Sequence, residues 1–439
     1  MYPPNTIKGA STTRAAKNRP LTRAPVPCFH ARMKEIPGGV CAPKGFAASG
    51  VSCGIKASPG KKDLALICSR EPCSAAAVFT TNRVQAASVL VTKEHIAGGS
   101  LRAAITNSGN ANACTGEAGL AAARRMAELA AGALGVEPRE VAVASTGVIG
   151  VPLPIEKIEG GIAALAGALR GDEAGHAAAL DAIMTTDTRR KEIAVEVEIG
   201  GAPVRIGGMA KGSGMIHPNM ATMLCFLTTD AAAGPETLGR LLRRAAARSF
   251  NRVTVDGDTS TNDMALIMAN GAAGAPPLRE GGEGFEAFAG ALEAACVSLA
   301  RAMARDGEGA TKLVSVTARG ARSEADAERL AKSVAGSSLV KAACFGADAN
   351  WGRVLCAMGY SGAEFDPGRV GARFRSAAGE IAVCAGGACL PFSEEEARRV
   401  LSRDEIEILI ECGEGGGEAT AWGCDLTYDY VKINGDYRS

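Results

Sequence analysis

A short apolar run constrains the fold of this 439-residue chain more than any other feature. "MLCFL" (residues 223–227) is continuously apolar and directly follows a loop that contains Gly212, Gly214 and Pro218. A strand of this composition has to be covered on both faces, because neither set of alternating side chains tolerates water. The run therefore predicts a central strand in a sheet that carries helices on both sides.

Helical and strand patterns alternate around this run. Residues 117–135 are rich in Ala and Leu and end in glycine, which predicts a helix. "EVAVAS" then predicts a strand that breaks at Thr146-Gly147. Residues 191–210 alternate apolar and polar on each side of Gly200-Gly201, a pattern typical of a hairpin. Together they predict a mixed α/β fold with layered sheets covered by helices.

Three further patterns complete the fold prediction in the second half of the chain. A helical face is expected from five apolar residues, and a capping box from Ser393 with Glu396. The tail from Ala421 to Ser439 is read as a final strand with an ordered end. The five apolar residues are Phe285, Phe288, Leu292, Leu299 and Met303.

Composition argues against several classes of function. The net charge is +1 and aromatic residues make up 4%, so neither a nucleic acid nor an anionic membrane is an expected partner. No uninterrupted apolar stretch approaches the roughly 20 residues of a membrane-spanning helix. The 14 cysteines are scattered without a closely spaced zinc-type pair, and only four histidines occur. We therefore expect reduced thiols, no metal site, no resident cofactor and a cytoplasmic location.

The first 32 residues differ from the rest of the chain. They contain six Lys or Arg residues and no acid, among Ser, Thr and Pro. This composition is open to two interpretations: a transit peptide, or an extension upstream of a true start at Met33. In either case we expect residues 1–32 to be disordered or absent from the mature fold.

Thr222 stands between Ala221 and the apolar run. Threonine is a poor nucleophile without an adjacent base, and the bland alternative is a good β-former at a strand start. If the peptide bond before Thr222 is cut, however, the freed α-amine can serve as that base, with a pKa of roughly 7.7–8.0. The small Ala221 would leave its carbonyl open to attack by the Thr222 hydroxyl.

Several longer motifs support the interpretation of Thr222 as a nucleophile that is freed by cleavage. "KGSGMIHPNMATML" (211–224) resembles the self-processing junction of the glutamate N-acetyltransferase family, also called ornithine acetyltransferases. "NSGNANACTG" (107–116), "STGVIG" (145–150), "TTDT" (185–188), "RDGEGATK" (305–312) and "YVKIN" (430–434) resemble other motifs of this family. They follow the family's order across about residues 36–439.

The resemblance implies a fold and a set of catalytic residues. The fold would be the layered, N-terminal-nucleophile-like ornithine acetyltransferase fold. Cleavage between Ala221 and Thr222 would give an alpha chain of residues 33–221 and a beta chain of residues 222–439. Thr222 would be the acetyl-accepting nucleophile, and Thr146 and Gly147 would stabilise the oxyanion. Without the family, Thr146-Gly147 would be an ordinary turn at a strand end.

The same resemblance assigns substrate-binding positions to Thr188, Lys211, Glu308, Asn434 and Ser439. An amino-acid substrate carries a carboxylate and an ammonium group, so we expect Lys211 to meet the first and Glu308 the second. In isolation, both would be read as solvated surface charges. His217 is interpreted as a loop residue and not a base. Residues 255–263, "VDGDTSTND", could line the site, although a hydrogen-bonded turn without a catalytic part is preferred.

The implied activity is acetyl transfer from N2-acetylornithine to glutamate, in arginine biosynthesis, giving ornithine and N-acetylglutamate. Acetyl-CoA stays open as a second donor. The resemblance also implies that the two-chain unit associates into a symmetric dimer or a larger assembly. Two rivals stay open: a self-processing amidohydrolase or aminopeptidase that uses the same threonine with water as acceptor, and a non-catalytic binding protein with an uncut chain.

Overall fold

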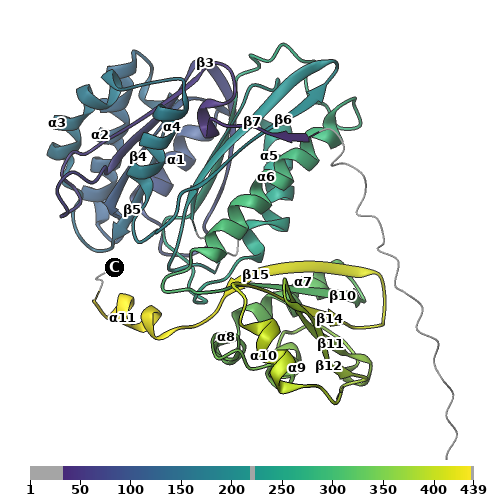
Figure 1. Cartoon of the computed structure of the whole chain (residues 1–439). Coiled ribbons are helices and arrows are strands. Elements are labelled where there is room, and N and C mark those ends of the chain that lie inside the picture. Colours follow the sequence, from purple (N-terminus) through teal and green to yellow (C-terminus); the bar gives the residue numbers. More distant parts are fainter. Residues whose placement is uncertain (1–32, 218–222, 437–439) are drawn as a thin grey trace, which may run out of the picture.

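The structure, a computed structural model, describes residues 33–217 and 223–436. Within these ranges the chain forms two sheets, one of nine strands and one of six, both packed against helices (Figure 1). The predicted mixed α/β class with layered sheets and covering helices is confirmed.

The nine-stranded sheet has the strand order β1-β6-β7-β8-β9-β3-β4-β5, and β2 pairs with β3. Its strands are β1 Met33–Glu35, β2 Phe46–Val51, β3 Leu64–Phe79, β4 Ser100–Asn110, β5 Val141–Val148, β6 Lys191–Ile199, β7 Ala202–Lys211, β8 Leu224–Thr229 and β9 Met264–Ala269. The parallel neighbours β8 and β9 are buried at every residue. The prediction of a central strand after residue 222 is confirmed, because alternate residues of β8 enter two different cores.

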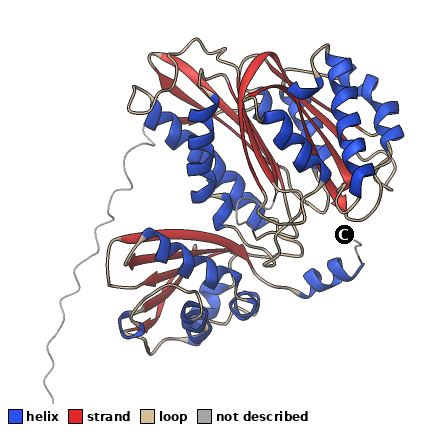
Figure 2. Cartoon of the chain, turned by 180° about the vertical axis from the view of Figure 1, so that it is seen from behind, coloured by secondary structure: helices blue, strands red, loops and turns tan. Residues whose placement is uncertain are grey.

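The two halves of this sheet, β6–β9 and β3–β5, share one interior core and so form two layers. Helices cover the outer side of each layer (Figure 2). On one side, α5 (Pro235–Arg248) and α6 (Phe285–Arg305) pack on β6–β9. On the other, α1 (Ala87–Ile96), α2 (Gly116–Leu134) and α3 (Ile155–Gly167) pack on the β3–β5 side. Between the two halves, α4 (Glu173–Ile183) and the 3-10 turn Gly39–Cys41 fill the interior. Short 3-10 turns also occur at Pro138–Glu140 and Phe250–Arg252.

Helix α6 is long and apolar enough, by length and composition alone, to cross a membrane. In the structure it is instead a core helix, because its apolar face packs on β6 and β7. All five residues that were predicted to share a helical face, from Phe285 to Met303, are buried there. Its length therefore reflects its role in the core of the large sheet.

The six-stranded sheet has the order β13-β12-β11-β14-β10-β15. Its strands are β10 Leu313–Ala321, β11 Gly371–Ser376, β12 Gly379–Ala385, β13 Ala388–Cys389, β14 Glu405–Glu411 and β15 Gly417–Cys424. One face packs on helices, whereas the other carries ion pairs such as Arg319–Glu418 and Arg375–Glu407. The helices are α7 Glu324–Gly336, α8 Ser338–Phe345, α9 Trp351–Gly359 and α10 Glu394–Leu401, with a 3-10 turn at Pro367–Arg369.

Most local predictions hold. The helix predicted at 117–135 is α2, which ends at Gly135 in the left-handed conformation, and the predicted hairpin is β6–β7. Ser393 caps α10 by accepting a hydrogen bond from the Glu396 backbone N–H, 3.2 Å. The predicted strand break at Thr146-Gly147 is wrong, because β5 stays paired with β4 as far as Val148.

The predicted final strand is also wrong beyond Cys424. The chain leaves the sheet at Asp425, and Tyr428–Asp436 forms helix α11 instead. Thr427 Oγ1 accepts the Tyr430 N–H at 3.3 Å, and Asn434 Nδ2 donates to the Tyr430 carbonyl one turn earlier in the helix, 3.0 Å. Alternating aromatic and polar residues mimic a strand here, but local hydrogen bonds close a helix.

The predicted division of the chain after residue 221, which stays a prediction, would not coincide with the boundary between the sheets. Strands β7 and β8 lie on either side of it and pair along their length, Ile206 with Thr229 through Lys211 with Leu224. The two sheet regions instead meet between α6 and β10.

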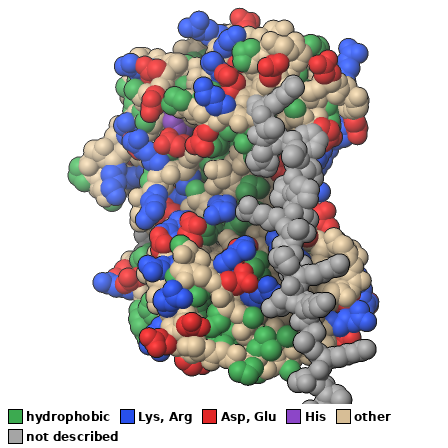
Figure 3. Space-filling view, turned by 45° about the vertical axis from the view of Figure 1, so that its right-hand side comes forward, with side chains coloured by type: hydrophobic (Ala, Val, Ile, Leu, Met, Phe, Trp, Pro, Cys, Tyr) green, Lys and Arg blue, Asp and Glu red, His purple; other side chains and the backbone are tan. Residues whose placement is uncertain are grey.

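Positive and negative side chains are interspersed over one face of the molecule (Figure 3).

Candidate active site

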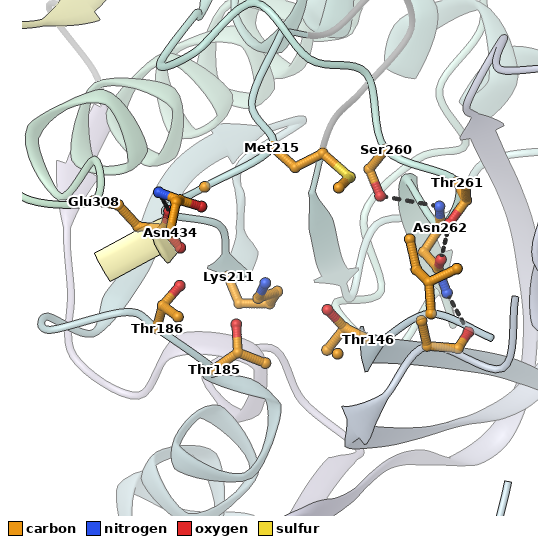
Figure 4. Close-up of a pocket in the computed structure, with 14 residues that line it drawn as sticks. Thr146, Thr185, Thr186, Lys211, Met215, Ser260, Thr261, Asn262, Glu308 and Asn434 are labelled. Atoms are coloured by element: carbon orange, nitrogen blue, oxygen red, sulfur yellow. Dashed lines mark hydrogen bonds between the residues drawn. The ribbon is translucent and has the colours of Figure 1, made fainter. Parts of the chain in front are cut away.

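A cavity of about 100 Å³ lies where β5, β7 and the segment after α6 meet. Figure 4 shows Lys211 between Thr185 and Thr146, with Glu308 and Asn434 toward one end. The walls come from seven separate segments of the chain. The lining residues are Ala111, Thr146, Gly147, Ile149, Thr185, Thr186, Lys211, Gly214, Met215, Ser260, Thr261, Asn262, Glu308 and Asn434.

Thr146 and Gly147 enter the cavity from the carboxyl end of β5, beside its parallel neighbour β4. Gly147 has a φ of 133°, and a Cβ there would lie 2.4 Å from the Gly109 carbonyl carbon of β4. Only glycine allows the two strands to approach this closely. The Thr146 hydroxyl and the unhindered backbone of Gly147 are therefore presented together to the cavity.

Lys211 is the last residue of β7 and pairs with Leu224 at the start of β8. Its side chain is buried, and among the described residues none forms a hydrogen bond or ion pair with its ammonium. Burial lowers the pKa of Lys211, while the charges of Asp187 and Glu308 oppose that shift. A buried cation without a fixed partner is suited to bind an anionic group of a ligand.

A buried ion cluster stands behind Lys211. Lys191 Nζ lies 2.6 Å from Asp187 Oδ1 and 2.6 Å from Asp306 Oδ2. Asp187 also accepts the backbone N–H groups of Thr185, 2.9 Å, and Gly212, 2.8 Å. Burial alone would raise the pKa of Asp187, but the positive charges of Lys211 and Lys191 hold it well below its usual range. The cluster therefore fixes two walls of the cavity.

Glu308 supplies the negative charge of the cavity. Its backbone N–H donates to the Ser213 carbonyl at 2.9 Å, and its carboxylate accepts from Asn434 Nδ2 at 2.8 Å. A Cβ on Gly214 would lie 2.3 Å from the Glu308 carboxyl carbon, so only glycine allows this packing. Helix α11 thus reaches from the small sheet to the cavity (Figure 1). The Lys211–Glu308 pair suits the carboxylate and ammonium groups of an amino acid.

A second hollow of about 30 Å³ adjoins the cavity and shares Thr146, Lys211, Gly214, Met215, Ser260 and Asn262 with it. Its other walls include Met223 and Leu224, the residues that follow position 222. The start of β8 therefore lies beside Thr146 and Lys211, although residue 222 itself lies outside the described residues.

The structure brings together five of the residues selected from the sequence: Thr146, Gly147, Lys211, Glu308 and Asn434. The interpretation of Lys211 and Glu308 as solvated surface charges is wrong, since both are at most 8% exposed. Thr188 does not line the cavity; its hydroxyl and N–H donate to Asp306, whereas its neighbours Thr185 and Thr186 line the wall. Ala221, Thr222 and Ser439 lie outside the described residues.

Sequence reasoning underrated the 255–263 segment. Ser260, Thr261 and Asn262 line the cavity, and Asn262 Nδ2 donates to the carbonyls of Ala111, 2.7 Å, and Ser145, 2.8 Å. The polar run was the available signal, but it did not distinguish a turn from a cavity wall. The segment is both, because its side chains also bond within the turn.

His217 is the last described residue before position 218. Burial lowers the pKa of His217 to about 4, so the ring is neutral near pH 7. Its Nδ1 lies 2.9 Å from Thr254 Oγ1.

Within residues 33–217 and 223–436, no group of three or more His, Cys, Asp or Glu side chains could hold a metal ion. The expectation of a site without metal or cofactor stays a prediction.

Comparison with known proteins places these residues in a family. The ArgJ family matches residues 47–439. The arginine biosynthesis bifunctional protein ArgJ of Symbiobacterium thermophilum is 56% identical over 408 residues, which cover 93% of this chain and 100% of the relative. The protein of the same name from Caldanaerobacter subterraneus subsp. tengcongensis is 51% identical over 407 residues, 93% and 100% of the two chains.

Among solved structures, the crystal structure of arginine biosynthesis bifunctional protein ArgJ from Bacillus halodurans is 46% identical to the matched part. The match covers 49% of this chain and 100% of that chain, with a TM-score of 0.47.

Proposed function

The chain belongs to the ArgJ family, and we propose a route by which its own residues carry out acetyl transfer. The enzyme is a glutamate N-acetyltransferase of arginine biosynthesis, with amino-acid N-acetyltransferase as its second activity. Its substrates are acetylornithine and glutamate. The proposal concerns the nucleophile, the pocket and the processing of the chain.

We propose that the chain cuts itself between Ala221 and Thr222. The Thr222 hydroxyl attacks the Ala221 carbonyl carbon, the bond to the Thr222 nitrogen breaks, and the hydroxyl proton passes to that nitrogen. Water then hydrolyses the resulting ester and restores the hydroxyl. The products, residues 33–221 and 222–439, keep the shared nine-stranded sheet because β7 and β8 stay paired.

In the transfer reaction, Thr222 Oγ attacks the acetyl carbonyl carbon of N2-acetylornithine, and the freed α-amine takes its proton. The oxyanion forms beside Thr146 and the Gly147 backbone, and the leaving ornithine amine receives the proton. Glutamate then attacks the acetyl ester and leaves as N-acetylglutamate. The observation that carries this assignment is that Met223, Leu224, Thr146 and Lys211 line one hollow.

Within the cavity, Lys211 would bind the substrate carboxylate, and Glu308, held by Asn434, would bind an ammonium group. Thr188 acts through Asp306 in this scheme, behind the wall formed by Thr185 and Thr186. Ser439 keeps its predicted place among the substrate-binding residues. Acetyl-CoA would be the donor for the second activity, and no metal or redox cofactor is needed.

Two wider assignments accompany the proposal. The thirteen cysteines within the described residues are all free thiols, which supports the cytoplasm as the compartment. A symmetric dimer of two-chain units rests on the family resemblance and can be tested by native mass measurement.

The test is denaturing mass analysis of wild type beside Thr222→Ala, followed by an acetyl-transfer assay. We expect two wild-type fragments, the second beginning at Thr222, and one intact Thr222→Ala chain without transfer. An uncut wild-type chain that still folds would contradict the mechanism and favour a binding protein. Release of free acetate without acceleration by glutamate would favour an amidohydrolase that uses the same threonine.

A further inference from the structure

The segment Thr254–Thr259, here called the clamp, holds Met215–His217, the last described residues before position 221. We propose that Asp256 of the clamp is a positioning residue for self-cleavage. This inference rests on the proposed function, because it concerns the same scissile bond. It assigns a role to part of the polar run 255–263 that the transfer mechanism does not use.

We call Met215–His217 the upstream arm. Each of its three residues contacts the clamp. Asp256 Oδ2 accepts the Met215 N–H at 2.6 Å, and Oδ1 accepts the Ile216 N–H at 2.8 Å. The Val255 N–H donates to the Ile216 carbonyl at 2.6 Å. Thr259 Oγ1 donates to the His217 carbonyl at 2.9 Å. The arm is therefore bound through backbone groups, which fixes its path more tightly than side-chain packing alone.

The backbone conformation of Met215 is one that a hydrogen-bond acceptor can stabilise. Its φ of 55° lies in the left-handed region that a residue with a side chain seldom adopts. Asp256 accepts the N–H of this residue and of the next, so the carboxylate stabilises the conformation directly. Carboxylate acceptors form stronger hydrogen bonds than neutral ones.

The clamp is itself held from the small-sheet side. Lys341 Nζ of α8 donates to the Val255 carbonyl at 2.6 Å and to the Cys424 carbonyl at 2.8 Å. The Thr254 N–H donates to the Trp422 carbonyl of β15 at 2.9 Å. On the other side of the junction, Leu224 is fixed in the middle of the large sheet. Both arms of the scissile bond thus start from rigid supports.

Self-cleavage requires a hydroxyl to stay close to the preceding carbonyl carbon, so it depends strongly on how the two arms are held. After cleavage the nucleophile belongs to the β8 side, so transfer depends on Met215–His217 mainly through the part of the cavity wall that Met215 forms. We therefore expect Asp256 to affect the cleavage rate more than the transfer rate of chains already cut.

The test compares Asp256→Asn with a matched control, Asp230→Asn. Asp230 also accepts one backbone N–H on each oxygen, from Arg205 at 2.7 Å and Lys44 at 3.1 Å, but it follows the far end of β8. The measurements are the cleavage time course by denaturing mass analysis, the melting temperature, and kcat and KM of the cleaved fraction. Wild type and Thr222→Ala are followed in parallel.

We expect Asp256→Asn to slow cleavage by about tenfold or more, while Asp230→Asn cleaves at the wild-type rate despite an equal or larger fall in melting temperature. Equal cleavage rates in Asp256→Asn and wild type would overturn the inference. So would equal slowing in both Asn variants, because that result indicates general destabilisation. If Asp256→Asn does not fold, Thr259→Val replaces it, with an expected slowing of about threefold; an unchanged rate there would overturn the inference too. An uncut wild-type chain would instead contradict the proposed self-cleavage, and this result is distinct from the outcomes for the variants.

Discussion

Two buried lysines, one from each sheet region, have different surroundings. In the large region, Lys211 faces the cavity, and no described residue forms a hydrogen bond or ion pair with its ammonium. In the small region, Lys341 is equally buried, but its ammonium donates to two carbonyl oxygens. A buried cation with fixed partners supports structure, whereas one without them is available to a ligand.

The two sheets also differ in the burial of their faces and in their position relative to the cavity. The large sheet is buried on both faces, and the cavity opens where its strands end. The small sheet packs helices on one face and carries ion pairs on the other, and none of its described strand residues lines the cavity. It acts on the site through Lys341, the Trp422 carbonyl and the attached helix α11. Most of the cavity wall thus belongs to the large region, whereas the small region contributes Asn434 and contacts that support the wall.

The largest expected effect tests the cavity lysine. Lys211→Met should lower kcat/KM for acetyl transfer by about 100-fold or more while the melting temperature stays near that of wild type, because an anion-binding group is lost but no hydrogen bond to a described residue is broken. Steady-state kinetics and thermal unfolding measure the two quantities. A large fall in stability would show that Lys211 is structural, and the contrast between the two lysines would fail.

The reciprocal substitution tests the supporting lysine. Lys341→Met leaves the Val255 and Cys424 carbonyls without their donor, so we expect about 2–4 kcal/mol less free energy of unfolding. Denaturant unfolding measures this change. Transfer by the protein that remains folded should fall only a few-fold. A loss of kcat/KM as large as in Lys211→Met, without a change in stability, would contradict the division of roles.

A smaller effect is expected at the contact between the two regions. Asn434→Ala removes the hydrogen bond from α11 to the Glu308 carboxylate, and we expect KM for the amino-acid substrates to rise about tenfold with little change in kcat. Lys432→Ala, an exposed change on the same helix, is the control. If both variants raise KM equally, the helix matters only through its folding.

The smallest effect concerns pH. Burial holds the pKa of His217 at about 4 in the folded state, against an ordinary value of 6.5. Between these values the unfolded chain binds more protons than the folded one, so stability falls as the pH drops from 6.5 toward 4. Because the ring is partly exposed, we expect His217 to account for only about 1 kcal/mol of this fall.

Urea unfolding of wild type and His217→Asn at pH 7 and pH 4.5 measures the pH effect. The stability difference between the two pH values should be smaller in His217→Asn than in wild type. An unchanged difference in His217→Asn would assign the acid sensitivity to other groups, such as the Asp187 carboxylate.

Prediction from the sequence succeeded where local pattern and burial agree. The apolar run after residue 222, the helix at 117–135 and the hairpin at Gly200-Gly201 all formed as predicted. It failed in the tail, where Tyr428–Asp436 alternates like a strand but pairs with no strand of the described residues and closes helical hydrogen bonds instead. Thr188 donates to Asp306 while its neighbours Thr185 and Thr186 line the cavity, and its predicted substrate-binding role stays a prediction, because a motif does not reveal which of its side chains turns inward.

The sequence by itself determined the family, the α/β class and most residues of the site, because its motifs carry specific side chains at fixed positions. Only the tertiary structure decided that Lys211 lacks a partner among the described residues, while Lys191 and Lys341 have theirs. It also decided that the clamp holds Met215–His217 from about 40 residues further along the chain. The reason is physical: a side chain's charge and shape are local properties, whereas its burial and its partners depend on segments that only folding brings together.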